Sequence, residues 1–247
     1  MKKIILIAAM KALSAGATAQ INFGAHVGGN LANIKGEQKE SVTTTKGLTK
    51  PKLGFLVGVV AVIPVTDAIS FRPEFNFIQK GYNLDVNRSQ SGVKIVSTGD
   101  GTFNYIELPL NFVYRLPSGD NTFLFGIGPT LGYGLSGKYK YIITSTIPGF
   151  PAQTQSGDGH VKFDGKKSSD VPVGDPDQHV KALDIGAGIL GGYKLSNGLY
   201  FQAGFTLGLN DLDSNPNSSL KNNGASIKLG YMFGKKQIDN LKKNRHY

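Results

Sequence analysis

A glycine-rich string in the last third of the chain has the spelling of a dinucleotide-binding loop. Gly186, Gly188 and Gly191 follow the pattern G-x-G-x-x-G, which holds a pyrophosphate where a strand turns into a helix. Here the string lies inside a stretch of alternating polar and apolar residues, where Gly186 and Gly188 share the polar side with Asp184. We interpret these glycines as small residues facing a crowded interior, and no nucleotide cofactor is expected.

A second stretch resembles the start of a calcium-binding loop. Asp211, Asp213 and Asn215 have the spacing of its first ligands, but Pro216 occupies the position that needs glycine and Asn222 that of the bidentate glutamate. A turn-rich loop is therefore the favoured interpretation. A loose calcium site stays open as an alternative in the acidic segment with Asp170, Asp175 and Asp177.

Catalytic side chains are few. The chain has no cysteine, which excludes a disulfide framework, a thiolate metal site and a cysteine nucleophile. His26 and Ser226 would approach each other if the first and last strands paired, but both fall on a polar face without an acidic partner. The histidines show no metal-ligand spacing; they are His26, His160, His179 and His246. We predict no catalytic residue, no metal site and no enzymatic activity.

The elements that would position these residues are strands. The chain has 247 residues, of which only 18% are charged, and its longest relevant apolar run, 55–65, is too short for a membrane-spanning helix of roughly 20 residues. Apolar residues instead recur at every second position, as in Phe71, Phe75 and Phe77, with polar residues between them. The alternation predicts strands at 21–32, 53–64, 68–82, 103–116, 121–136, 180–195, 198–211 and 223–234.

Long and short connections alternate between these strands. The short connections have turn residues, such as Asn197-Gly198, whereas the long ones are 33–52, 83–102, 137–179 and 212–222. Such alternation is typical of an even, antiparallel, up-and-down sheet that closes on itself. We therefore predict an all-β protein with an eight-stranded antiparallel up-and-down barrel. A soluble β-sandwich is the alternative.

The side-chain volume on the two faces of the strands indicates which face points into the barrel. An eight-stranded barrel leaves an interior just wide enough for side chains to fill. The polar faces are rich in Gly, Ser, Thr and Asn, which fit such an interior, whereas the apolar faces carry Phe, Leu, Ile and Tyr. We therefore predict a transmembrane barrel with lipid outside and a narrow, side-chain-filled lumen.

Six charged residues lie on the polar faces and are predicted to form a lumen charge network, because unpaired charges in a narrow interior would be costly. They are Arg72, Glu74, Glu107, Arg115, Asp184 and Lys228. Nine aromatic residues gather at the strand ends next to the short turns, where an interfacial girdle is expected. They are Phe23, Phe71, Phe112, Tyr114, Phe123, Tyr193, Phe201, Tyr231 and Phe233.

The two ends of the chain have their own character. Lys2 and Lys3 precede an apolar stretch and a small-residue site near residue 19, which predicts a secretory signal peptide over 1–19. A short amphipathic helix is the alternative there, since Lys11 interrupts the apolar stretch. The tail 235–247 has five basic residues and one acidic residue. It is predicted to be periplasmic, as a solvated terminus or as a contact for anionic lipid or a periplasmic protein.

Two motifs resemble the PorT-like outer-membrane β-barrel family of Gram-negative bacteria. Arg72-Pro73-Glu74 is followed by Gln79-Lys80-Gly81, and later by Tyr105-Ile106-Glu107-Leu108-Pro109-Leu110. The resemblance spans essentially all of 20–234 and implies the barrel fold and the outer membrane, with little about activity. Members are commonly called porins. Unlike many of them, this chain continues for 14 residues beyond Phe233.

The prediction is thus an exported, non-enzymatic outer-membrane barrel over 20–234 with a structural or surface-binding role and both ends in the periplasm. Its expected partners are outer-membrane lipid and the barrel assembly machinery during biogenesis, and no nucleic acid. The first alternative is an accessory of a protein export or assembly complex, with a periplasmic or secretion-complex partner. A lipid-modifying enzyme is a weaker one.

Overall fold

The computed structural model describes residues 21–39, 44–46, 49–90, 92–215 and 218–233. The predicted signal peptide (1–19) and basic tail (235–247) lie outside these residues. In the described part of the chain, no helix is long and apolar enough to cross a membrane.

Strands make up most of the described residues. They are β1 (Asn22–Lys39), β2 (Thr44–Lys46), β3 (Thr49–Pro64), β4 (Ile69–Gln90), β5 (Val93–Ser118), β6 (Asn121–Thr146), β7 (Gln153–Lys162), β8 (Gln178–His179), β9 (Leu183–Lys194), β10 (Leu199–Gly208) and β11 (Ser218–Phe233). A single helical turn accompanies them within these ranges, η1 (Ser168–Asp170).

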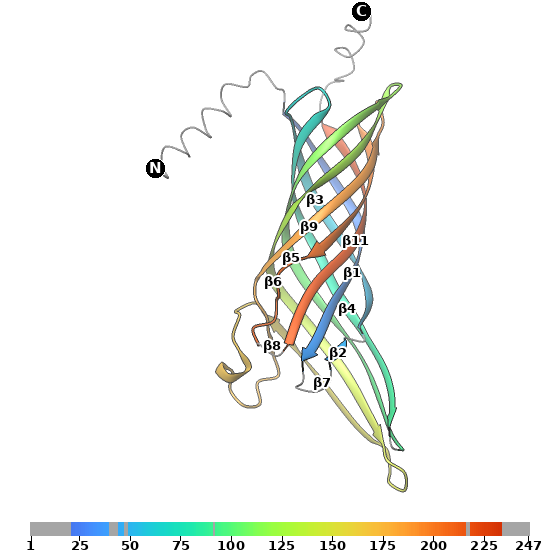
Figure 1. Cartoon of the computed structure of the whole chain (residues 1–247), viewed down its shortest axis with the longest axis vertical. Helices are drawn as coiled ribbons and strands as arrows, with labels where there is room; N and C mark the ends of the chain where they lie inside the picture. Colours follow the sequence, from blue (N-terminus) through green and yellow to red (C-terminus); the bar gives the residue numbers. More distant parts are fainter. Residues whose placement is uncertain (1–20, 40–43, 47–48, 91, 216–217, 234–247) are drawn as a thin grey trace, which may run out of the picture.

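Eight of the described strands close into a ring, which Figure 1 shows as a barrel of tilted strands. The order is β1, β3, β4, β5, β6, β9, β10, β11, and β11 pairs back onto β1, with Phe23 opposite Phe233 and Val27 opposite Leu229. Neighbouring strands in the ring are antiparallel. The predicted eight-stranded antiparallel up-and-down barrel is confirmed.

The two ends of the barrel differ. The short turns 65–68, 119–120 and 195–198 lie at one end, together with Asn22 and Phe233; we call this the turn end. Gly119 and Gly198 have φ angles of 62° and 96° there, a conformation that side chains with a Cβ rarely adopt. The opposite end, where β4, β5 and β6 project, is called the arm end.

The arm end differs from the predicted long loops. β4 and β5 stay paired from Leu84–Gly99 out to Gln90–Val93, and β6 and β7 stay paired from Gly137–Val161 to Ser145–Gln153. Residues 85–90, 92–100 and 138–160 thus form a four-stranded sheet that extends beyond the barrel, which we call the arm (Figure 1). The prediction of a loop over 83–102 is wrong, and so is the prediction of a loop over 137–179 for its part up to residue 162. A sheet that is exposed on both faces needs no apolar alternation.

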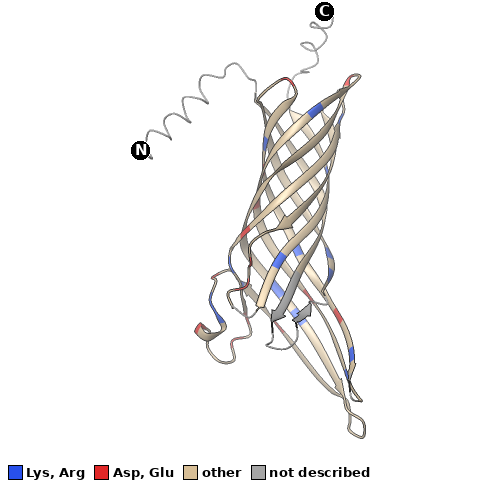
Figure 2. Cartoon of the chain, viewed as in Figure 1, with Lys and Arg blue, Asp and Glu red and all other residues tan. Residues whose placement is uncertain are grey.

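The barrel wall carries apolar side chains outside. Val57, Phe75, Ile127 and Phe205 are exposed on it, and the residues two positions before and after each of them are uncharged. Figure 2 shows charged residues sparse along the upper barrel and more frequent toward the arm end. A β-barrel that crosses a membrane has this outer surface.

The interior is only partly the small, polar lumen that the sequence predicts. Leu56, Ile78, Phe103 and Tyr105 form a buried cluster toward the arm end, and Tyr200 packs with Val60 and Met232 near the turn end. These bulky residues lie inside because an eight-stranded barrel must be packed along its whole length, and apolar side chains fill its ends at the lowest desolvation cost. Polar and charged residues occupy the middle.

Candidate functional site

The first group of lumen charges surrounds Glu74 on β4. The carboxylate is fully buried, and Lys228 Nζ from β11 donates to Oε2. Arg72 Nε lies 3.6 Å from Oε1, and Gln202 Nε2 donates to the same oxygen over 3.3 Å. One carboxylate therefore faces two cations, and the group carries a net positive charge.

His26 lies against the same carboxylate. Its Nε2 is 2.7 Å from Asn76 Oδ1 and its Nδ1 is 2.9 Å from the hydroxyl of Tyr200. Because an amide oxygen can only accept, Nε2 carries a proton and donates to Asn76, while Nδ1 shares a hydrogen bond with the tyrosine hydroxyl. Both ring nitrogens are thus engaged. Ser226 lies opposite Asn30 in the β1–β11 pairing, whereas His26 lies opposite Gly230, so the structure does not bring His26 and Ser226 together.

The second group surrounds Lys80, which is absent from the predicted set. Lys80 Nζ lies 2.6 Å from Glu107 and 3.2 Å from Asp184, and Asn222 Nδ2 donates to Asp184 over 2.9 Å. This group has one cation and two carboxylates, the reverse of the Glu74 group. Lys80 could have been found from the sequence, because it is separated from Arg72 and Glu74 by an even number of residues on one strand.

Arg115 does not join either group. Its Nη2 donates to the backbone oxygens of Thr66 and Asp67, at 2.8 and 2.9 Å, in the 65–68 turn. The structure therefore brings five of the six predicted charges into the lumen interior, in two groups, and places Arg115 at the turn-end mouth. Its position close to the end of β5, rather than its face, accounts for the difference.

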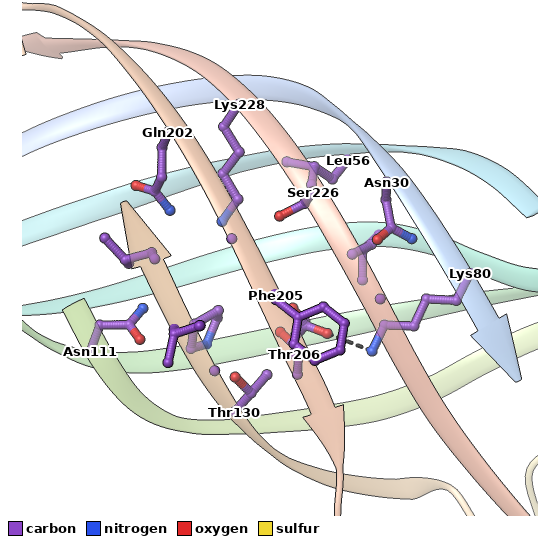
Figure 3. A pocket seen from close by; sticks show the side chains of 18 of the residues that line it. Asn30, Leu56, Lys80, Asn111, Thr130, Gln202, Phe205, Thr206, Ser226 and Lys228 are labelled. Carbon is purple, nitrogen blue, oxygen red and sulfur yellow. Dashed lines mark ion pairs between the residues drawn. The ribbon is translucent and has the colours of Figure 1, made fainter. Parts of the chain in front are cut away.

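A cavity of about 40 Å³ separates the two groups. Lys228 from β11 and Lys80 from β4 both reach into it, and polar side chains such as Asn111, Thr130 and Gln202 contribute to its lining (Figure 3). It has room for about three water molecules. Oxygen atoms of Gln202 and Asn222 are buried there without a hydrogen-bond partner in the described chain, so the cavity suits water.

A segment between β7 and β9 covers the arm-end mouth. Phe163 packs its ring edge-on against Tyr105, with centroids 5.3 Å apart, above the apolar cluster. Lys162 Nζ lies 2.7 Å from Asp177, and His179 Nδ1 lies 2.8 Å from Asp164. The hydrogen bond from Lys162 holds the pKa of the Asp177 carboxyl below its usual value. Apolar packing and ion pairs therefore hold this cover in place.

The candidate calcium-binding and nucleotide-binding residues lie in ordinary turns and strands. Among the described residues, no group of three acidic or histidine side chains could hold a metal ion. Asp211 Oδ1 accepts from the backbone of Asp213 and Leu220, as in a turn-rich loop. Gly186, Gly188 and Gly191 lie within β9, not at a strand-to-helix turn.

The nine predicted girdle aromatics lie in the turn-end half of the ring strands. Phe23, Phe112, Tyr114, Phe123, Phe201, Tyr231 and Phe233 are exposed. Phe71 and Tyr193 are half-buried because their rings contact Phe112 and Phe123, with centroids 5.3 and 4.7 Å apart.

Three solved structures are similar to this chain at low sequence identity. Ail of Yersinia pestis, an attachment invasion locus protein, is 13% identical with a TM-score of 0.38, over 87% of this chain and 99% of that one. Neisserial surface protein A is 13% identical with a TM-score of 0.30, over 85% and 96%. The toluene transporter TodX of Pseudomonas putida is 8% identical with a TM-score of 0.31, over 91% and 92%. No curated protein sequence matches the chain.

Residues 14–214 match the family described as "Outer membrane protein beta-barrel domain". The match covers most of the chain and all but the last strand of the ring. The family, the closed antiparallel ring and its apolar outer wall agree with one another, and they place the protein in the outer membrane. The chain belongs to the outer membrane protein beta-barrel domain family.

Proposed function

We propose that the protein is a non-enzymatic outer-membrane barrel with a closed lumen, and that its arm binds a protein partner outside the cell. In this proposal 1–19 is a cleaved signal peptide, and the turn end and both chain ends lie in the periplasm. The short turns and the accumulation of charged residues toward the arm end support this orientation.

The arm is the observation on which the binding role rests. Among the described residues, β4 has no strand partner on its outer side beyond Leu84, and β7 pairs on its second side only at Val161 and Lys162. These unpaired edges offer backbone N–H and C=O groups to an extended protein segment. The β6–β7 turn adds an apolar tip, in which Ile147 and Phe150 are 47% and 70% exposed.

We further propose that the protein is a PorT-like member of its family, commonly called a porin. The motifs that carry this resemblance contain Arg72, Glu74, Lys80 and Glu107, which are charges of the two lumen groups. The motifs thus coincide with residues that build the interior. Outer-membrane lipid and the assembly machinery that inserts barrels are the remaining proposed partners.

The closed lumen predicts that the protein does not conduct ions. Among the described residues, apolar clusters lie toward both ends of the lumen, and the ion pairs in the middle flank a cavity of about 40 Å³. Planar-bilayer recording of the purified full chain is expected to show no steady conductance steps. Reproducible single-channel steps, absent from a mock preparation, would show that the lumen opens and would contradict the closed-barrel role.

The binding role predicts that the arm tip captures a partner. Ile147→Ser with Phe150→Ser should remove the partners that the wild type retains from a detergent extract, because the tip loses its apolar surface. Val173→Ser is the matched control, since Val173 is equally apolar and fully exposed outside the arm. Stability and gel migration should not change in either variant. Retention of every partner by the tip variant would contradict the proposal.

The alternative role, an accessory of a protein export or assembly complex, predicts the opposite pattern. Partners would then depend on the basic tail 235–247 and on the short turns. Deletion of 235–247 should abolish capture in that case and leave it unchanged if the arm is the binding surface. The same extract distinguishes the two roles.

A further inference from the structure

We propose that the turn-end mouth of the lumen binds a phosphate-type oxyanion through Arg72, Arg115 and Lys194. This site uses the barrel interior alone, so it does not depend on whether the arm binds a partner. It uses nitrogen atoms that the two lumen groups leave without partners.

Arg72 is the buried wall of this site. Its side chain is 3% exposed, and its guanidinium carbon lies 4.7 Å from the ring centre of Tyr200. Nε and Nη2 have no hydrogen-bond partner among the described residues. Glu74 does not satisfy them, because that carboxylate lies 3.6 Å away and accepts from Lys228 and Gln202 instead. A buried guanidinium with unused N–H groups is costly unless something accepts from them.

Two further cations lie near Arg72 at this mouth. Arg115 uses Nη2 for the turn carbonyls, and its Nε is buried without a partner in the described chain. Lys194 ends β9 opposite Tyr200, the residue whose ring Arg72 contacts, and Arg115 and Arg72 repel its ammonium. No ion pair joins Lys194 to a carboxylate within the described ranges.

The charge balance at this mouth favours an anion. Arg72, Arg115, Lys194 and Lys228 are four cations in the turn-end half of the lumen. The carboxylate inside is Glu74, and Asp67 and Asp120 lie on the neighbouring turns. The cations outnumber these three acids. A bound anion would reduce the repulsion between Lys194 and the two arginines.

The donors select the class of anion. Two guanidinium groups and one ammonium present more N–H donors than a carboxylate can accept, whereas a phosphate has three acceptor oxygens and up to two negative charges. The ligand is therefore a phosphate group, either as free phosphate or as part of a lipid headgroup in the adjacent leaflet.

The test is phosphate-dependent stabilisation of the purified full chain. Thermal unfolding in detergent, followed by heat-modifiable gel migration, is measured as inorganic phosphate replaces chloride at constant ionic strength. The wild type should show a saturable rise in midpoint. Lys194→Gln should need at least about tenfold more phosphate, as expected for losing a charged hydrogen bond. Arg88→Gln, which removes an exposed arginine of the arm, should behave as the wild type.

Lys194→Gln carries the test because Arg72 variants disturb the Glu74 group and can fail to fold. Equal responses of the wild type and Lys194→Gln, or no saturation, would overturn the site. Dioctanoyl phosphatidic acid, tested in the same way, distinguishes the sources. A half-saturating concentration below that of inorganic phosphate assigns the site to a lipid headgroup, and a higher one assigns it to soluble phosphate.

Discussion

Replacing Glu74 with leucine is expected to lower the free energy of unfolding of the barrel by about 3–5 kcal/mol. The substitution leaves Lys228 and Arg72 in the lumen without the buried carboxylate that now lies between them. It also removes an acceptor of Gln202. Urea titration of the purified protein in detergent, followed by heat-modifiable gel migration, measures the change.

A second substitution separates charge pairing from packing. Glu74→Leu combined with Lys228→Met removes both partners of the Glu74–Lys228 ion pair, and it should recover part of the lost stability. Asp85→Asn is the control, because Asp85 pairs with Lys50 at 2.6 Å on the exposed arm, where an ion pair contributes less than about 1 kcal/mol. If Glu74→Leu unfolded at the same urea concentration as Asp85→Asn, the lumen charges would not stabilise the barrel.

Gly28→Ala is expected to prevent closure of the barrel. A methyl group on Gly28 would lie 2.1 Å from the backbone oxygen of Ile227, on the strand that closes the ring. The contact can be relieved only by moving β1 away from β11, because a backbone atom has no rotamer to change. The cost is expected to be about 3 kcal/mol or more. Isolated outer membranes should therefore contain little heat-modifiable protein.

The next residue provides the matched control. Gly29 faces outward, and a methyl group there would come no closer than 3.9 Å, to a side-chain carbon of Ile227. Gly29→Ala should accumulate as the wild type does and change stability by less than about 0.5 kcal/mol. Both substitutions add one methyl group to β1. A difference between them therefore reports the close approach of β1 and β11 and not the strand propensity of alanine. Normal accumulation of Gly28→Ala would show that β1 and β11 can separate enough to accommodate the methyl group.

The alternation of residue types determined the barrel itself. Leu199–Gly208 and Leu183–Lys194 lie within the predicted strands 198–211 and 180–195, and the ring closes as the long and short connections require. Side-chain direction in a strand has a period of two, so it can be read along one segment without knowledge of its neighbours. The same rule predicted that Glu74 and Lys228 face the lumen.

The alternation could not reveal the arm. β4, β5 and β6 continue well beyond the predicted strand ends, where water lies on both faces of the sheet and polar residues are tolerated at every position. The packing of Phe163 over the arm-end mouth could not be predicted for a related reason. Its partners Phe103 and Tyr105 come from another strand, and no local pattern links them.

The pairing of the lumen charges was decided by the tertiary structure alone. Residue types showed that Glu74, Glu107 and Asp184 needed cations, whereas ring closure and strand stagger determined that Lys228 reaches the first and Lys80 the other two. The height of a side chain along the barrel axis depends on the register of every strand pair around the ring. Direction is therefore a local property of the sequence, and partnership across the lumen is a property of the closed barrel.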